Sequence, residues 1–221
     1  MIASYDWDGG TEAMLRFGPD SGPVVIAALP LFEEANRIRA LVVTVLRLLA
    51  DRGVAGALPD MPGQGESLIA TDTITIEMLR TGFAAACASL GNRPIHVLSI
   101  RSGALVECEA QVQSRWRLAP QSGPELLRDM DRVARASELG GSKSDPLEHA
   151  GNRLSQTFID GLRDADGGAD GPVRVIRTSE GQPGTVIEGP ALWRRSEPDT
   201  DPVFAAKIAD DIAQWIATCE G

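Results

Sequence analysis

Short apolar runs that alternate with amphipathic stretches dominate the first half of this chain. The runs are six or seven residues long and occupy 23–29 (PVVIAAL), 54–59 (VAGALP) and 94–100 (PIHVLSI). This length and composition are typical of strands that are buried on both faces of a sheet. Because a predicted helix follows each run, the order strand–helix occurs three times. This order predicts an α/β domain with a mostly parallel, doubly wound sheet.

The predicted helices follow from apolar residues that recur at helical spacing. The first covers 34–52 and ends at Gly53, the second begins at a cap formed by Asp72 or Thr73, and the third covers 103–113. In the second half, we expect helices over 123–139 and 153–165, a polar loop over 140–152, strands over 172–176 and 185–193, and a last helix after Pro202. The whole chain, 1–221, is predicted to form one domain.

Composition excludes several classes of function. The chain has 221 residues, a net charge of −10 and only two lysines, Lys143 and Lys207, so it has no basic cluster for nucleic acid. The cysteines at 87, 108 and 219 fall in predicted helices and indicate core thiols in a reducing compartment. No signal-like start and no membrane-spanning apolar run is visible, so we expect a cytoplasmic protein. The sequence does not specify an oligomeric state.

A small residue, a turn and a glycine follow the third apolar run, in the segment Ser99-Ile100-Arg101-Ser102-Gly103. An α/β-hydrolase places its nucleophile at the centre of such a strand-to-helix turn. Here the central residue is Arg101. A guanidinium is always protonated and only donates hydrogen bonds, so it cannot attack a carbonyl carbon. The pattern therefore predicts a hydrolase-like turn that lacks the usual nucleophile.

Several segments together resemble the exosortase A system-associated hydrolases of the α/β-hydrolase superfamily, over about two thirds of the chain. They are 29–37 (LPLFEEANR), the loop 60–67 (DMPGQGES), the turn 100–103 (IRSG), 115–117 (RWR), and 191–193 (ALW) with Glu197-Pro198. The chain departs from the family pattern at Leu98-Ser99, where the family has Trp-Gly. The resemblance implies an α/β-hydrolase fold with a short helical cap at about 120–170. It also implies a bacterial protein linked to exopolysaccharide and PEP-CTERM protein sorting.

The two histidines do not complete a serine-hydrolase triad in the usual order, in which the histidine follows the last strand. His96 lies inside the third predicted strand, where a packing role is expected. His149 lies in the polar loop and would have to reach back to act as a base. Ser102 is either a helix cap or a displaced nucleophile, and Ser99, at the strand end, is a weaker candidate for that nucleophile.

Arg101 is expected to point into a pocket at the carboxyl edge of the sheet, where it needs an anion. One interpretation is an internal ion pair with Glu33 or Glu34, which follow the first apolar run. The alternative is an anionic ligand held by Arg101 and the start of the third helix. Ser102, Phe32 and Trp193 complete the predicted pocket.

No phosphate-binding loop and no metal-ligand spacing is present, so we expect no cofactor and no metal. We expect Asp60 to cap backbone amides in its glycine-rich loop. The first hypothesis is a non-catalytic protein that binds a small anionic or acyl ligand or has an accessory role. The alternative is a carboxylester or thioester hydrolase that uses Ser102 or Ser99 with His149.

Overall fold

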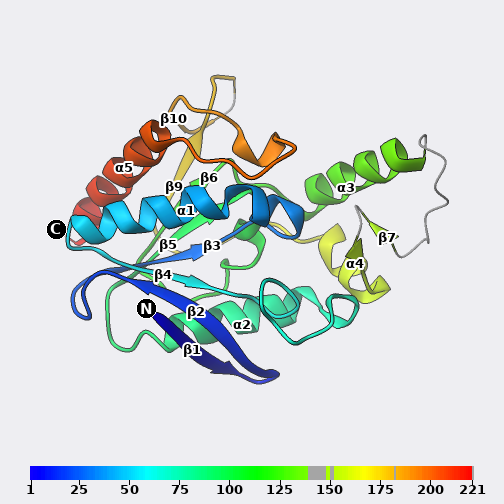
Figure 1. The fold of residues 1–221 in the computed structure, drawn as a ribbon, viewed down its shortest axis with the longest axis horizontal. Helices are drawn as coiled ribbons and strands as arrows, with labels where there is room; N and C mark the ends of the chain where they lie inside the picture. Colours follow the sequence, from blue (N-terminus) through cyan, green and yellow to red (C-terminus); the bar gives the residue numbers. More distant parts are fainter. Residues whose placement is uncertain (139–147, 150–151, 182, 221) are drawn as a thin grey trace.

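An eight-stranded, mostly parallel sheet forms the centre of the protein in a computed structural model (Figure 1). The structure describes residues 1–138, 148–149, 152–181 and 183–220. The strand order is β1-β2-β4-β3-β5-β6-β9-β10; β2 runs antiparallel to its two neighbours, and every other pairing is parallel. The strands are β1 Ile2–Trp7, β2 Gly10–Phe17, β3 Val24–Ala28, β4 Ala55–Pro59, β5 Ile95–Ile100, β6 Ser114–Leu118, β9 Val173–Arg177 and β10 Thr185–Val186. The predicted doubly wound sheet is confirmed.

Helices cover both faces of the sheet, as its two apolar faces require. The helices are α1 Glu33–Asp51, α2 Ile76–Ala88, α3 Gly123–Glu138, α4 Gln156–Arg163 and α5 Pro202–Glu220. Helices α1 and α5 share one core with Leu98 and Trp116, whereas α2 packs in a second core with Tyr5 and Val97. Figure 1 shows α1 and α5 on one side of the sheet and α2 on the other.

Helices α3 and α4 lie together beyond the carboxyl ends of the strands, in the region predicted to be a cap (Figure 1). Leu126 and Met130 of α3 and Phe158 and Leu162 of α4 belong to the same core as α2. Ser155 caps α4 by accepting a hydrogen bond from the Phe158 amide. The predicted polar loop 140–152 lies largely outside the described residues, except for the strand β7 Glu148–His149 and its antiparallel partner β8 Asn152–Arg153.

The predicted helix over 103–113 is wrong. A short 3-10 helix, η2 (Arg101–Leu105), is followed by turns and then by β6, which the sequence analysis missed. The reason is electrostatic: the Glu107 side chain turns into the protein to meet two arginines on β6. Those arginines made 114–118 look like an exposed segment, although every residue of β6 is buried.

Two smaller predictions also differ from the structure, and one hairpin was not predicted. The cap of α2 is Thr75, which accepts from the Met78 amide, because Thr71–Thr73 forms a separate 3-10 turn, η1. The predicted strand over 185–193 is only β10 followed by a 3-10 helix, η3 (Leu192–Arg194), since Pro190 cannot donate to a strand ladder. The hairpin of β1 and β2 had no counterpart in the predicted elements.

A buried cluster of charged side chains lies next to Ser99, near the carboxyl end of β5. Glu107, 0% exposed, accepts from Arg115 Nε at 2.6 Å, from Arg117 Nε at 2.7 Å and from the Ser99 hydroxyl at 3.2 Å. Arg115 also donates to the carbonyls of Cys108 and Ala110. A buried pair of cations is stable only with such an anion and such acceptors, so Glu107 holds β6 to the turn after η2.

We expect Glu107→Gln to lower the free energy of unfolding by about 3–5 kcal/mol, because two buried guanidiniums lose their anion. Urea denaturation measures this loss. The matched control is Glu109→Gln, which removes an ion pair with Arg80 from a side chain that is 62% exposed. That control should cost less than about 1 kcal/mol. Equal losses in the two variants would contradict a stabilising role for the buried cluster.

His96 joins the sheet to α5. Its Nδ1 lies 2.8 Å from the Ser114 hydroxyl and its Nε2 lies 3.3 Å from Glu220 Oε1. Since a carboxylate only accepts, Nε2 donates to Glu220, and Nδ1 of the neutral ring accepts from Ser114. Burial lowers the pKa of His96 below its ordinary value, and the Glu220 carboxylate opposes this effect only in part. The native protein therefore favours the neutral imidazole.

A lowered pKa makes the contribution of His96 to stability present above its ordinary pKa near 6.5 and lost as the pH falls below it. We expect the free energy of unfolding to fall more steeply for the wild type than for His96→Gln between about pH 7.5 and pH 5.5. Urea titrations at the two pH values measure the difference. His149 is present in both proteins, so its contribution to the pH slope is the same in each. Identical pH slopes would refute the assignment.

Candidate functional site

The chain makes a tight turn after β5, as the sequence predicts, and the backbone at the centre of this turn is strained. Arg101 has a φ of 54°, in the left-handed region that residues with a side chain seldom adopt. Gly103 approaches β3 so closely that a Cβ atom would lie 2.2 Å from the Ala28 carbonyl oxygen. Only glycine fits there, so Gly103 lets the turn pack directly against the end of β3.

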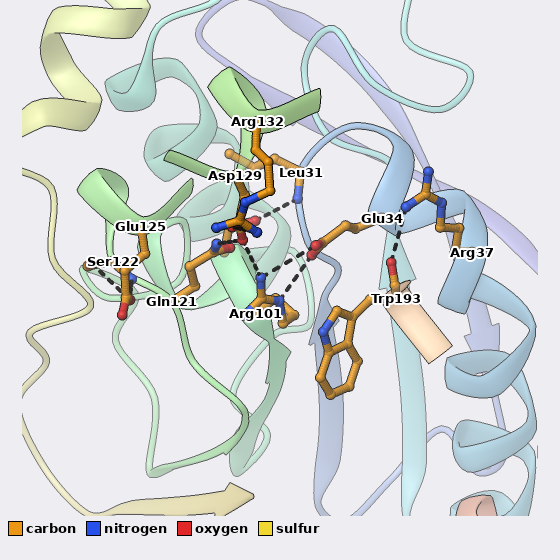
Figure 2. A network of polar contacts seen from close by, with 11 residues as sticks. Leu31, Glu34, Arg37, Arg101, Gln121, Ser122, Glu125, Asp129, Arg132 and Trp193 are labelled. Carbon is orange, nitrogen blue, oxygen red and sulfur yellow. Dashed lines mark hydrogen bonds and ion pairs between the residues drawn. The ribbon is translucent and has the colours of Figure 1, made fainter. Parts of the chain in front are cut away.

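Two carboxylates hold the Arg101 side chain, as Figure 2 shows. Arg101 Nε donates to Glu34 Oε2 at 3.2 Å, and Nη2 donates to Asp129 Oδ2 at 3.0 Å. The guanidinium carbon also lies 5.6 Å from the centre of a Trp193 ring, and the side chain is 13% exposed. The predicted internal pair thus forms with Glu34, whereas Glu33 is exposed and pairs with Arg37.

Asp129 is the partner that sequence reasoning missed. It lies on α3, and it also accepts from Gln121 Nε2 at 2.8 Å and pairs with Arg132 at 3.1 Å (Figure 2). The guanidinium therefore links α1 to α3 across the carboxyl edge of the sheet. Burial raises the pKa of the Glu34 carboxyl above its ordinary value, and the adjacent Arg101 opposes that shift.

Neither candidate serine hydroxyl faces a cavity. Ser102, 0% exposed, accepts from the Leu31 amide at 3.0 Å, so it caps no helix and instead fastens η2 to the loop after β3. Ser99, 1% exposed, donates to Glu107. The expected helix-cap role of Ser102 is wrong because η2 is a single short turn whose free amides it does not bind.

The two histidines lie apart from one another in the fold. His96 lies near the amino end of β5, opposite the turn, and its ring contacts Ser114 and Glu220 rather than Ser102. It is therefore not the base for the turn. His149 belongs to β7, but its side chain lies outside the described part of the structure, so a pair with Ser102 stays a prediction.

The loop between β3 and α1 has its own strain. Phe32, which precedes α1, has a φ of 61°, and its amide donates to Gln64 Oε1 at 3.3 Å. In hydrolases of this type the corresponding loop supplies an amide to the oxyanion hole. Here the amides of Leu31 and Phe32 already bind side chains, those of Ser102 and Gln64.

Trp193 is both a pocket residue and a core residue. It lies in η3, is 4% exposed, and covers one face of the Arg101 guanidinium (Figure 2). Arg37 donates to its carbonyl at 3.2 Å, which ties η3 to α1. A cation over an aromatic face is stabilised by the ring quadrupole, so Trp193 adds to the hold on Arg101.

In the described part of the chain, two larger cavities and a small one of about 80 Å³, which Leu31, Glu34 and Asp129 help to line, open at this edge of the sheet. The Arg101 cavity, about 380 Å³, is lined by Arg101, Trp193, Glu125, Arg177 and Arg194. The β3–β4 cavity, about 310 Å³, is lined by residues of the segments 28–39 and 59–71 with Val106 and Asn152.

Asp60 lines the β3–β4 cavity, and its carboxylate pairs with Arg39 at 3.0 Å, a partner that the predicted amide cap does not include. A Cβ atom on Gly65 would lie 2.6 Å from the Asp60 carboxylate, so a residue with a side chain would clash at this position. Sequence reasoning also missed Arg39 and Gln64 in this cavity and Arg177 and Arg194 in the other. Their spacing carries no motif.

Among the described residues no group of histidine, cysteine, aspartate and glutamate side chains is placed to hold a metal ion. Within the same residues, no helix is long and apolar enough to cross a membrane. The described cluster around Arg101 is instead a network of guanidiniums and carboxylates.

No protein-family model matches this chain, and no curated protein matches it in sequence. Solved structures match it in fold. Alpha/beta hydrolase domain-containing protein 10 from mouse has a TM-score of 0.66 at 13% identity, with 99% of each chain covered. A thermophilic esterase from Thermogutta terrifontis, solved with malate, has a TM-score of 0.57 at 15% identity, with 100% of each chain covered. Est1E from Butyrivibrio proteoclasticus has a TM-score of 0.56 at 19% identity, covering 80% of this chain and 76% of its own. The chain adopts the α/β-hydrolase fold.

Arg101→Gln should lower the free energy of unfolding by about 1–3 kcal/mol, because Glu34 and Asp129 lose a partly buried cation. The double variant Arg101→Gln/Glu34→Gln should lose less than the sum of the two single losses, since the second change removes an uncompensated carboxylate. Chemical denaturation of the four proteins of this cycle measures the coupling.

Glu33→Gln is the control for this cycle, because Glu33 is the neighbouring carboxylate on the same helix and is 59% exposed. It should change stability by no more than about 0.5 kcal/mol. Strict additivity of Arg101→Gln and Glu34→Gln would show that the pair contributes nothing.

Proposed function

We propose that this protein is a non-hydrolytic member of the α/β-hydrolase fold that binds a small anionic or acyl ligand at the carboxyl edge of its sheet and serves as an accessory protein. The observation that carries this proposal is Arg101, which stands at the strained turn and is held by Glu34 and Asp129. A guanidinium at that point supplies charge and hydrogen-bond donors but no nucleophile.

The surrounding groups support a role without hydrolysis. Ser102 and Ser99 are buried and hydrogen-bonded, so neither hydroxyl reaches a cavity. The amides of Leu31 and Phe32, which would stabilise an oxyanion, bind the side chains of Ser102 and Gln64. A substrate carbonyl at this edge would have to displace those side chains.

The ligand class in this proposal comes from the chemistry of the edge and from its relatives in fold. Arginines line both cavities, Arg39 in one and Arg101, Arg177 and Arg194 in the other, and guanidiniums bind carboxylates in a bidentate manner. The Thermogutta terrifontis esterase, a neighbour in fold, was solved with malate, a small carboxylate. The resemblance to exosortase-associated hydrolases suggests a bacterial, cytoplasmic protein of an exopolysaccharide and PEP-CTERM system.

The second candidate is a carboxylester or thioester hydrolase that uses Ser102 or Ser99 with His149. The observation that favours it is the occurrence of esterases among the neighbours in fold. It requires a rearrangement that exposes a serine hydroxyl and brings the His149 ring within hydrogen-bond reach of it.

Hydrolysis of short p-nitrophenyl esters and labelling by a fluorophosphonate probe separate the two candidates. We expect the wild type, Ser102→Ala and Ser99→Ala to show the same background rate and no labelling, because no activated hydroxyl is available. An α/β-hydrolase of known activity in the same assay controls for the reagents. Turnover and labelling that disappear in either serine variant would overturn the proposal and establish the hydrolase.

A further inference from the structure

The β3–β4 cavity is lined by both apolar and polar residues. The apolar residues include Leu29, Pro30, Leu31, Met61, Ile69 and Val106. The polar residues include Asn36, Arg39, Asp60 and Gln64. A cavity of about 310 Å³ with this mixed lining suits a small amphipathic molecule.

Gln64 presents a donor that the protein does not use. Its Oε1 accepts from the Phe32 amide at 3.3 Å, which orients the side-chain amide. Its Nε2 is buried and has no hydrogen-bond partner among the described residues. A buried N–H donor without a partner is uncommon in folded proteins, and a small rotation of the Gln64 side chain would let Nε2 donate to an acceptor in the cavity.

Arg39 supplies a second set of hydrogen-bond donors to the same cavity. Its Nη2 donates to Asp60 Oδ1 at 3.0 Å, and its side chain is 35% exposed. A guanidinium has five N–H donors in a fixed fork, so Arg39 retains donors for a second carboxylate. No other partner of this side chain occurs in the described part of the chain.

The carboxylates that line the cavity do not oppose an anion with their full charge. Asp60 is paired with Arg39, and Glu33 is paired with Arg37 at 2.7 Å and is 59% exposed. Because these two carboxylates are paired, the groups that select a ligand are the Gln64 amide and the N–H donors of Arg39 that do not bind Asp60.

We infer that the β3–β4 cavity binds a small monocarboxylic acid. The carboxylate contacts Arg39 and, after a small rotation of the Gln64 side chain, Gln64 Nε2, and the acyl chain lies against the apolar residues of the lining. This inference rests on the proposed function, to which it adds a place and a class of ligand. The ligand in this inference lies in a cavity that Arg101, Glu34 and Asp129 do not line.

The test is calorimetric titration of the full chain with hexanoate, hexanamide and acetate. Hexanoate should bind saturably, hexanamide should bind at least about tenfold more weakly because it lacks the charge, and acetate should bind at least about tenfold more weakly because it lacks the chain. Equal binding of hexanoate and hexanamide would overturn the inference, as would a lack of saturable hexanoate binding at millimolar concentration.

Two variants locate the site. Gln64→Glu keeps an acceptor for the Phe32 amide but replaces the Nε2 donor with a repelling oxygen, and Arg39→Gln removes the charge. Each should weaken hexanoate binding by at least about tenfold. Arg47→Gln, an exposed position on the same helix, is the matched control and should bind as the wild type does. Thermal unfolding of each variant confirms that it is folded.

The possible failures are distinguishable. Binding that persists in Gln64→Glu and Arg39→Gln but is lost in Arg101→Gln would move the ligand to the Arg101 cavity and overturn this inference alone. Serine-dependent ester turnover would overturn the proposed function, while hexanoate binding that depends on Gln64 would still establish the site.

Discussion

The Arg101 guanidinium is the group on which the carboxyl edge of this protein depends. A partly buried cation at a strained turn must have anions close by, and it finds them on two helices, at Glu34 of α1 and Asp129 of α3. Because both helices contact this one side chain, Arg101 fixes the positions of α1 and α3 at the carboxyl edge of the sheet. The same contacts lie at the turn after β5, where the sequence pattern predicts the position of a hydrolase nucleophile.

A second group of buried charges, centred on Glu107, also stabilises this part of the structure. Glu107 binds Arg115, Arg117 and Ser99, so the turn that follows η2 is fixed to β6 by charge rather than by a helix. Ser102 then fastens η2 to the loop after β3 through the Leu31 amide. Ser99 and Ser102, which flank the centre of the turn, thus both act as hydrogen-bonding groups within the fold.

Much of the sheet was predictable, and the reason is burial. The strands β3, β4 and β5 are buried on both faces, so each is a mostly apolar run of the kind that strands in the middle of a sheet have. Strand β6 was missed because Arg115 and Arg117 look exposed in the sequence, and only their contact with Glu107 makes them core residues. A pair of Arg101 with Glu33 or Glu34 was predictable from two strand ends at one edge of the sheet, and the structure shows that the partner is Glu34. Asp129 was not, since its position depends on how α3 crosses the edge.

The sequence by itself determined the fold class, the absence of a nucleophile at the centre of the turn and the need of Arg101 for an anion. These follow from local chemistry: apolar periodicity, the guanidinium of one residue and the cost of an unpaired buried charge. Only the tertiary structure decided which carboxylates meet Arg101, that Ser102 is buried against Leu31, and that Gln64 Nε2 lacks a partner beside Arg39. Those facts depend on contacts between segments far apart in the chain, and no local pattern in the sequence specifies them.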